Sequence, residues 1–215
     1  MTRIRLFHTP ELVPYPQAVT FMESYVGDIL NNGAEGALWL LEHPPVITAG
    51  TSAQSQDIIL PSTIPICQTG RGGKHTYHGP GQRIVYIMLD LNHFNKDLRH
   101  FVRMLEQWLM NTFATIGLKT CSRKNRVGIW VPESTNHQES KIAAIGLRVK
   151  RWVTYHGVAI NVSPDLNHFQ TIVPCGIKDL GVTSLANEGI NLTMSEIDDI
   201  LIQEFYKLFQ VRVLT

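Results

Sequence analysis

The sequence has too few cysteines, in the wrong pattern, for a disulfide framework or a cysteine-based zinc site. It carries three, Cys67, Cys121 and Cys175, with no CxxC spacing among them. Small secreted domains use even sets of cysteines, and zinc ribbons use closely spaced pairs. Each cysteine is therefore treated as a single thiol.

Long apolar runs and an excess of charge of one sign are also missing. No apolar run approaches the roughly 18 residues that indicate a membrane span, and residues 1–8 lack the apolar core of a signal peptide. We interpret residues 1–8 as an edge strand of a cytoplasmic protein. The formal net charge of +1 gives no support to nucleic-acid binding, which usually shows a strongly basic face.

What is present describes an ordinary globular chain. Hydrophobic residues make up 44% and charged residues 17% of the 215 positions. The length predicts one domain, residues 1–215, and no internal repeat divides it. A small helical part is expected at the C-terminus, over roughly residues 190–215.

Helical periodicity and end signals predict three main helices. Pro16 and Gly33 bracket the first, and the second covers residues 97–116. The third begins at a capping-box pattern with Thr193 and Glu196. Strands are predicted at residues 36–41, 46–48 (an edge), 64–68, 83–89, 127–131, 141–150, 152–162 and 171–173. This order of elements indicates an α+β domain with a largely antiparallel sheet.

One glycine-rich segment, residues 70–82, stands out. Its five glycines and one proline predict a loop, because glycine and proline both disfavour regular structure. Basic, aromatic and imidazole side chains lie between the glycines, which favours a binding site over a plain connection. A phosphate cradle or a metal site comes to mind first. His75 and His78 have no third ligand spaced nearby, however, so zinc is not expected.

A second candidate is Cys175, between Pro174 and Gly176. A lone cysteine is often just a small buried hydrophobe. A nucleophilic cysteine needs a partner that lowers the pKa of its thiol. The candidates for that partner are His75, His78, His156 and Lys141, the last of which would otherwise be a solvated strand end.

Together these segments resemble the lipoyl(octanoyl) transferases, the octanoyl-acyl-carrier-protein:protein transferases of lipoate biosynthesis. The matching blocks are residues 71–82, 141–146, 152–161, 174–177 and 181–185, in the family's order over nearly the whole chain. The resemblance implies the fold of the biotin and lipoate protein ligases, with a mixed sheet. It also implies that Cys175 carries the acyl group as a thioester and that Lys141 is its partner.

The resemblance assigns the substrate-binding residues as well. They are Arg71, Gly72, Gly73, Lys74, His75, Thr76, Tyr77, His78, Ala144, Ile145, Gly146, Gly157, Val158 and Ala159. The implied donor is octanoyl-acyl carrier protein. The implied acceptors are lipoyl domains of 2-oxoacid dehydrogenase complexes and the glycine cleavage H protein. The expected enzyme is a monomer that needs no cofactor, because thioester exchange is nearly balanced and amide formation is downhill.

Small residues on two neighbouring strands predict either a narrow apolar slot or close strand packing. They are Ala143, Ala144, Gly146, Gly157 and Ala159. Burial yields about 0.8 kcal/mol per CH₂, so attraction alone separates chains two carbons apart only about tenfold to twentyfold. Basic groups at residues 71 and 74, 123–126 and 148–151 are candidate docking points for an acidic carrier protein.

Two other functions remain open at this point. An ATP-dependent lipoate or biotin protein ligase would use the glycine-rich segment to cradle an adenylate, but it leaves Cys175 and Lys141 without a shared role. A non-catalytic module would bind acyl-carrier or lipoyl domains and transfer nothing.

Overall fold

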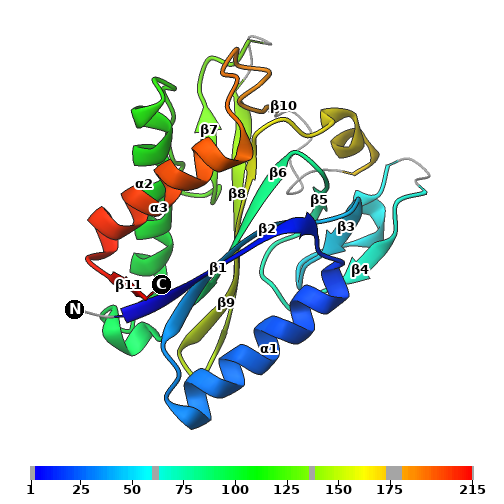
Figure 1. Ribbon diagram of the computed structural model, residues 1–215. Coiled ribbons are helices and arrows are strands. Elements are labelled where there is room, and N and C mark those ends of the chain that lie inside the picture. Colours follow the sequence, from blue (N-terminus) through cyan, green and yellow to red (C-terminus); the bar gives the residue numbers. More distant parts are fainter. Residues whose placement is uncertain (1–2, 60–62, 136–138, 173–180, 215) are drawn as a thin grey trace.

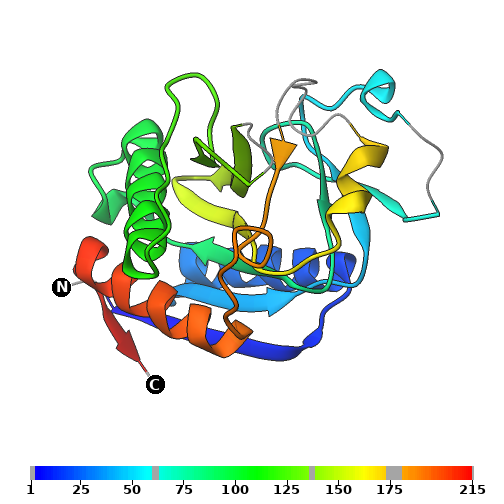
Figure 2. The same cartoon turned by 90° about the horizontal axis from the view of Figure 1, so that it is seen from above.

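The structure is a computed structural model that describes residues 3–59, 63–135, 139–172 and 181–214. A mixed main sheet forms its centre, with helix α1 on one face and helices α2 and α3 on the other (Figures 1 and 2). A smaller sheet lies beside it. The sequence-based prediction of an α+β fold with helices flanking a sheet is confirmed.

The main sheet has the strand order β10-β8-β9-β6-β2-β1-β11, and β7 pairs with β8. Its strands are β1 (Arg3–Leu12), β2 (Gly36–Glu42), β6 (Gln82–Met88), β7 (Ile129–Val131), β8 (Ser140–Lys150), β9 (Val153–Asn161), β10 (Gly181–Val182) and β11 (Arg212–Leu214). The central run from β2 through β6, β9 and β8 to β7 is antiparallel. Parallel pairs lie toward the margins, where β1 meets β2 and β11 and where β10 meets β8.

The helices begin and end where the sequence signals place them. The helices are α1 (Tyr15–Asn32), α2 (Leu98–Thr115) and α3 (Met194–Phe209). Gly33 ends α1 in the left-handed conformation, with φ of 67°. The Asp97 side chain caps α2, and Thr193 and Glu196 form a reciprocal capping box at α3. None of the helices that the structure describes has the length and apolar character needed to span a bilayer.

The two faces of the main sheet bury different sets of side chains. On the α2–α3 face the core is dense with large residues, among them Trp108, Phe101 and Phe205. On the other face, α1 packs against Trp39 and Tyr86 and covers only part of the sheet. Because neighbouring residues of a strand point to opposite faces, β6 and β9 contribute to both cores.

The C-terminal helix belongs to the main core rather than to an appendage. Residues Ile197, Leu201 and Phe205 of α3 pack into the same cluster as α2. A buried ion pair also joins α3 to the sheet, with Arg83 Nε 2.7 Å from an Asp198 carboxylate oxygen.

The smaller sheet corrects the prediction that all of the glycine-rich segment is a loop. Its order is β4 (Ile66–Gln68), β3 (Val46–Ala49) and β5 (His75–His78). Strand β5 lies inside the segment, because four consecutive residues without glycine pair antiparallel with β3. Strand β3 is consequently central in its sheet, not an edge as the sequence suggested.

Two smaller predictions are also corrected. The first strand is not outermost along its whole length, because β11 pairs with its first residues, Arg3 to Arg5. The extended piece predicted at residues 171–173 is different as well: Thr171 ends a 3₁₀ helix (Leu166–Thr171), and Ile172 forms an isolated bridge with Ile58. Residue 173 lies outside the described residues.

Candidate active site

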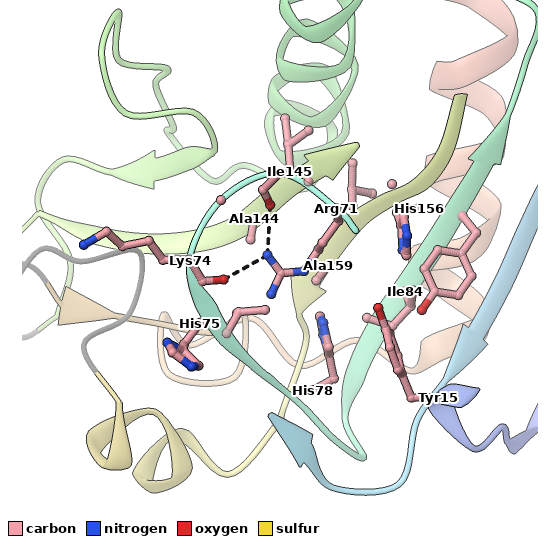
Figure 3. Close-up of a pocket in the computed structure, with 17 residues that line it drawn as sticks. Tyr15, Arg71, Lys74, His75, His78, Ile84, Ala144, Ile145, His156 and Ala159 are labelled. Atoms are coloured by element: carbon pink, nitrogen blue, oxygen red, sulfur yellow. Dashed lines mark hydrogen bonds between the residues drawn. The ribbon is translucent and has the colours of Figure 1, made fainter. Parts of the chain in front are cut away.

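A pocket lies on the α1 face of the main sheet, where the glycine-rich segment crosses β6, β8 and β9 (Figure 3). The lining residues come from this segment, from three sheet strands and from the start of α1. They are Tyr15, Arg71, Gly72, Gly73, Lys74, His75, Thr76, His78, Ile84, Tyr86, Ala144, Ile145, Gly146, His156, Gly157, Val158 and Ala159. The pocket therefore joins parts of the chain that are far apart in sequence.

Small residues facing one another across two strands make room for this pocket. Ala144 on β8 lies opposite Ala159 on β9, and Gly146 lies opposite Gly157. A Cβ on Gly157 would collide with the backbone carbonyl of Val85, so only glycine permits the close pairing of β9 with β6. Four of the five small residues predicted to form a slot line the pocket. The fifth, Ala143, instead faces the α2–α3 core.

The buried side chain of Arg71 holds the glycine-rich segment in place. Its NH1 group donates to the carbonyls of Gly72 and Lys74, each at 2.9 Å. Its NH2 group donates to the Thr48 carbonyl at 2.7 Å and to the Thr48 hydroxyl at 2.6 Å. Figure 3 shows this guanidinium between the segment and the strands. Arg71 thus shapes the pocket wall by binding backbone on both sides of it.

His78 continues this network as a neutral ring with one defined tautomer. Burial lowers the pKa of His78 to about 3. The Gln82 amide oxygen lies 2.7 Å from His78 Nδ1, so Nδ1 carries the hydrogen. The other ring nitrogen, Nε2, then accepts from the Thr48 hydroxyl at 3.3 Å.

The same network reaches the strand of Lys141. The Gln82 amide nitrogen donates to Asn161 Oδ1 at 2.9 Å, and the Asn161 amide nitrogen donates to the Thr183 carbonyl at 2.9 Å. The Thr183 backbone N–H then donates to the Lys141 carbonyl at 2.9 Å. Buried polar groups thus connect the pocket wall to the backbone of Lys141, which fixes their relative position.

Neutral rings also gather around Tyr86. His43 Nδ1 donates to the Val13 carbonyl at 2.5 Å, and His43 Nε2 accepts from the Tyr86 hydroxyl at 2.6 Å. Burial lowers the pKa of His43 to about 4 and raises the pKa of Tyr86 well above its ordinary value. The pKa of His156 is about 4, chiefly through burial and then through Arg71. These groups are uncharged at neutral pH, which suits an apolar ligand.

His156 has an unusual backbone conformation. Its φ is 59°, in the left-handed region that residues other than glycine rarely occupy. Its backbone N–H donates to the Met22 sulfur at 3.3 Å. The period-two pattern predicted for this strand is therefore interrupted here, and both His156 and Gly157 line the pocket. Strain of this kind often accompanies functional sites.

Lys141 is buried, contrary to the solvated strand end that its position in the sequence also allowed. Its side chain is near the start of β8, with a residue exposure of 8%. The Nζ donates to the Val127 carbonyl at 3.3 Å and lies 4.6 Å from the centre of the Trp130 ring. Three residues further along the same strand, Ala144 lines the pocket.

The structure brings most of the predicted substrate-binding residues together, with one exception. Thirteen of the fourteen line this pocket. Tyr77 does not, because its side chain is buried in a separate core with Ile47, Phe169 and Ile172. Cys175 lies outside the described residues. The other two cysteines, Cys67 and Cys121, are partly buried free thiols.

Sequence reasoning missed several residues of the pocket. Tyr15, Ile84 and Tyr86 line it but were not predicted. The signal for Ile84 and Tyr86 was their spacing of two on a buried strand, which places both on one face. Tyr15 carried no comparable signal. Within the described ranges, no three His, Cys, Asp or Glu side chains are grouped so that they could hold a metal ion.

Comparison with known proteins identifies the family of this chain. Residues 14–206 match the family described as the lipoyl protein ligase A/B catalytic domain. An octanoyltransferase of Wolbachia pipientis wMel is 50% identical over 93% of this chain and 96% of its own length. An octanoyltransferase of Brucella melitensis biotype 1 is 49% identical over 94% of this chain and 79% of its own.

Solved structures agree at the level of the fold. The bipartite lipoate protein ligase of Thermoplasma acidophilum superimposes with a TM-score of 0.73 at 14% identity, covering 100% of this chain and 88% of that one. The biotin protein ligase of Aquifex aeolicus, in complex with biotin and ATP, gives 0.58 at 12% identity, covering 98% and 71%.

The chain thus has the fold of the lipoate and biotin protein ligases. More specifically, the chain belongs to the lipoyl protein ligase A/B catalytic-domain family. The chain is identical to octanoyltransferases at about half of the aligned positions over most of its length. It is therefore an acyltransferase that transfers octanoyl groups in lipoate biosynthesis.

Proposed function

We propose that this enzyme moves an octanoyl group from acyl carrier protein to a lysine of lipoyl domains through a thioester on Cys175, with Lys141 as the proton carrier. The acceptors are the lipoyl domains of 2-oxoacid dehydrogenase complexes and the glycine cleavage H protein. The observation that carries the proposal is the burial of Lys141 on the strand whose continuation lines the pocket. A buried lysine in such a place is a candidate for proton transfer.

In the first step, the Cys175 thiolate attacks the carbonyl carbon of the octanoyl thioester. The new bond joins this carbon to the enzyme sulfur, and the bond to the pantetheine sulfur breaks. The Lys141 ammonium gives a proton to the departing pantetheine thiolate. The products are an acyl-enzyme, a neutral Lys141 and the free thiol of the carrier.

In the second step, the amine of the acceptor lysine attacks the carbonyl of the enzyme thioester. Neutral Lys141 takes one proton from the attacking nitrogen as the amide forms. The Cys175 sulfur leaves as a thiolate, so both enzyme groups return to their starting states. No nucleotide is consumed, because a thioester supplies the free energy for the amide.

The pocket is the proposed site of the octanoyl chain. It is lined by small residues of β8 and β9 on one side and by the glycine-rich segment on the other. The rings of Tyr15, Tyr86 and His156 stand around it without net charge. Each buried methylene contributes about 0.8 kcal/mol, so such a site favours a chain over a short acyl group. The predicted substrate-binding residues other than Tyr77 contribute to it in this proposal.

The test is the mass of the acyl-enzyme. Incubation with octanoyl carrier protein is expected to add one octanoyl group to the wild-type chain and none to Cys175→Ala. Matched controls are Cys67→Ala and Cys121→Ala, which should still be acylated. Burial raises the pKa of the Cys121 thiol, which makes it a poor nucleophile. An added mass that persists in Cys175→Ala overturns the nucleophile assignment.

A second measurement separates this function from that of a ligase. Free octanoate with ATP is expected to give no transfer, whereas octanoyl carrier protein without ATP is expected to give full transfer. The reverse result would establish an ATP-dependent ligase instead.

Lys141→Met tests the proton carrier. Methionine retains the unbranched stem against Trp130 but cannot transfer a proton. We expect acylation to slow by about 100-fold or more, the lower range of general acid–base contributions. Thermal unfolding of the same variant controls for damage to the fold. Unchanged acylation rates in a folded variant would remove Lys141 from the mechanism.

A further inference from the structure

A groove separate from the pocket runs along the outer side of α2, between this helix and residues 122–127. Apolar side chains line it, among them Leu98, Val102, Met110 and Val127. Two of these are unusually exposed for their type, Leu98 at 38% and Val127 at 47%. An exposed apolar groove on a soluble enzyme is a candidate surface for a protein partner.

Cations surround this apolar strip. Arg99, Arg103, Arg123 and Lys124 line the groove, against one carboxylate, Glu106. The Glu106 carboxylate is mostly buried and accepts from the Gly128 backbone N–H at 3.3 Å, so it points away from solvent. The groove therefore presents an excess of positive charge, which attracts an acidic partner.

Among the other candidate docking cations, Arg71, Lys74 and Arg148 are less available, whereas Lys150 and Arg151 are exposed. Arg71 is buried within the pocket wall, and the Lys74 ammonium lies 3.4 Å from a carboxylate oxygen of Asp57. Arg148 lies 4.0 Å from Glu23 and stacks over Tyr155. In the groove, Arg123 is paired with Glu139, but Arg99, Arg103 and Lys124 are exposed.

The groove adjoins Lys141 but not the pocket. Val127 contributes its side chain to the groove and its carbonyl to the Lys141 ammonium. The groove and the pocket share no lining residue, and α2 lies on the opposite face of the sheet from α1 (Figure 2). Lys141 thus stands on the strand between a basic surface and an apolar pocket.

We propose that this groove docks the donor, an acidic acyl carrier protein, whose exposed apolar residues contact the strip around Val127 while its carboxylates meet Arg99, Arg103 and Lys124. The inference rests on the proposed function, because it takes the carrier as the donor. The carrier delivers its acyl group on a long flexible phosphopantetheine arm, so its body can dock away from the pocket. An acceptor lysine reaches only as far as its own side chain, so we assign the groove to the donor.

Charge reversal tests the proposal. In the double variant Arg99→Glu/Arg103→Glu, we expect kcat/KM for acylation by octanoyl carrier protein to fall about tenfold or more, which is within the range of electrostatic steering. The kcat/KM for acylation by octanoyl-pantetheine, which lacks the protein, should stay within about twofold of the wild-type value. The matched control is Lys150→Glu/Arg151→Glu, which reverses two exposed cations on the β8–β9 turn. This control should acylate normally from both donors.

Three results would overturn the proposal: no loss with the carrier, an equal loss with both donors, or an equal loss in the control variant. If the variant instead slowed only the transfer of the octanoyl group from preformed acyl-enzyme to a lipoyl domain, the groove would belong to the acceptor. That result would also overturn the proposal. Direct binding of carrier protein, measured by fluorescence anisotropy at low and high salt, needs no acyl transfer. Binding that the groove variant loses therefore supports the docking surface even where the Cys175 mechanism fails.

Discussion

The two faces of the main sheet are covered in different ways, although the same strands supply both. On one face, α2 and α3 press large side chains such as Trp108 and Phe205 into a dense core. On the other, α1 covers part of the sheet, and the glycine-rich segment crosses the remainder above a pocket. Strand β9 sends Val158 and Ile160 to the first core and Ala159 to the second.

The difference separates a densely packed face from a face that holds the candidate site. A helix covers a sheet with a continuous stripe of side chains and leaves little room. A segment rich in glycine brings mainly backbone, which Arg71 then fixes through its hydrogen bonds. Site variation on the pocket face should therefore alter substrate use, and variation on the helix face should alter stability.

The largest expected effect comes from opening the dense face. In Trp108→Ala we expect a loss of about 3–5 kcal/mol in the free energy of unfolding, because the ring is fully buried and its Nε1 donates to the Leu201 carbonyl at 2.8 Å. This corresponds to a fall in melting temperature of roughly 6–20 °C for a chain of this size. The measurement is thermal unfolding followed by circular dichroism.

The control makes the same change at an exposed site. Trp152 is 39% exposed, so Trp152→Ala should alter the free energy of unfolding by about 0.5 kcal/mol or less. Equal destabilisation by both variants would contradict the idea that the α2–α3 core carries the stability.

The dense face is also the part that sequence predicts well. The stripe of α2 and the capping box at Thr193 depend on residues close together in the chain, so local rules place them. The glycine-rich segment is harder to predict from local rules, because the pairing of β5 with β3 depends on a partner some thirty positions away. The strand inside the segment was missed for this reason.

The sequence predicted which residues line the candidate pocket better than it predicted where their side chains point. Family resemblance identified thirteen residues that do line the pocket, yet Tyr77 turned into a neighbouring core. Tertiary packing decides which way a side chain on a short strand points. The left-handed backbone at His156 likewise leaves no trace in a period-two pattern.

The next largest effect is a loss of stability at acid pH, which we expect from the buried histidines on the pocket face. His43 and His156 have folded pKa values of about 4 and His78 of about 3, all on or beside the pocket and below the ordinary value of 6.5. Below pH 6.5 the unfolded chain gains protons that the folded chain does not bind. Stability is therefore complete above pH 6.5 and is lost as the pH falls toward 4, by about 1.4 kcal/mol per pH unit for each histidine.

Urea unfolding at several pH values between 7 and 4 checks this expectation. Replacing one ring in His43→Gln should reduce the slope of unfolding free energy against pH by about 1.4 kcal/mol per unit. His93 is exposed on the surface and provides the matched substitution, His93→Gln, which should leave the slope as it is. A slope unaffected by His43→Gln would show that the buried ring does not contribute to acid sensitivity.

The smallest effect comes from filling the open face by one methyl group. A Cβ on Gly146 would lie 3.2 Å from Arg71 Cδ and 3.5 Å from the Gly72 carbonyl, so Gly146→Ala narrows the pocket with little damage to the sheet. Losing the contact of one methylene costs about 0.8 kcal/mol, or about fourfold in the preference for octanoyl over butyryl donors.

Gly27→Ala on α1 is the control for this change, because its added Cβ meets no atom within 4 Å and should leave the preference intact. The ratio of kcat/KM for octanoyl- and butyryl-pantetheine is the measurement. An unchanged ratio in Gly146→Ala would mean that the acyl chain does not pass between β8 and the glycine-rich segment. A changed ratio with a normal melting temperature would place chain selection on the face that α1 leaves open.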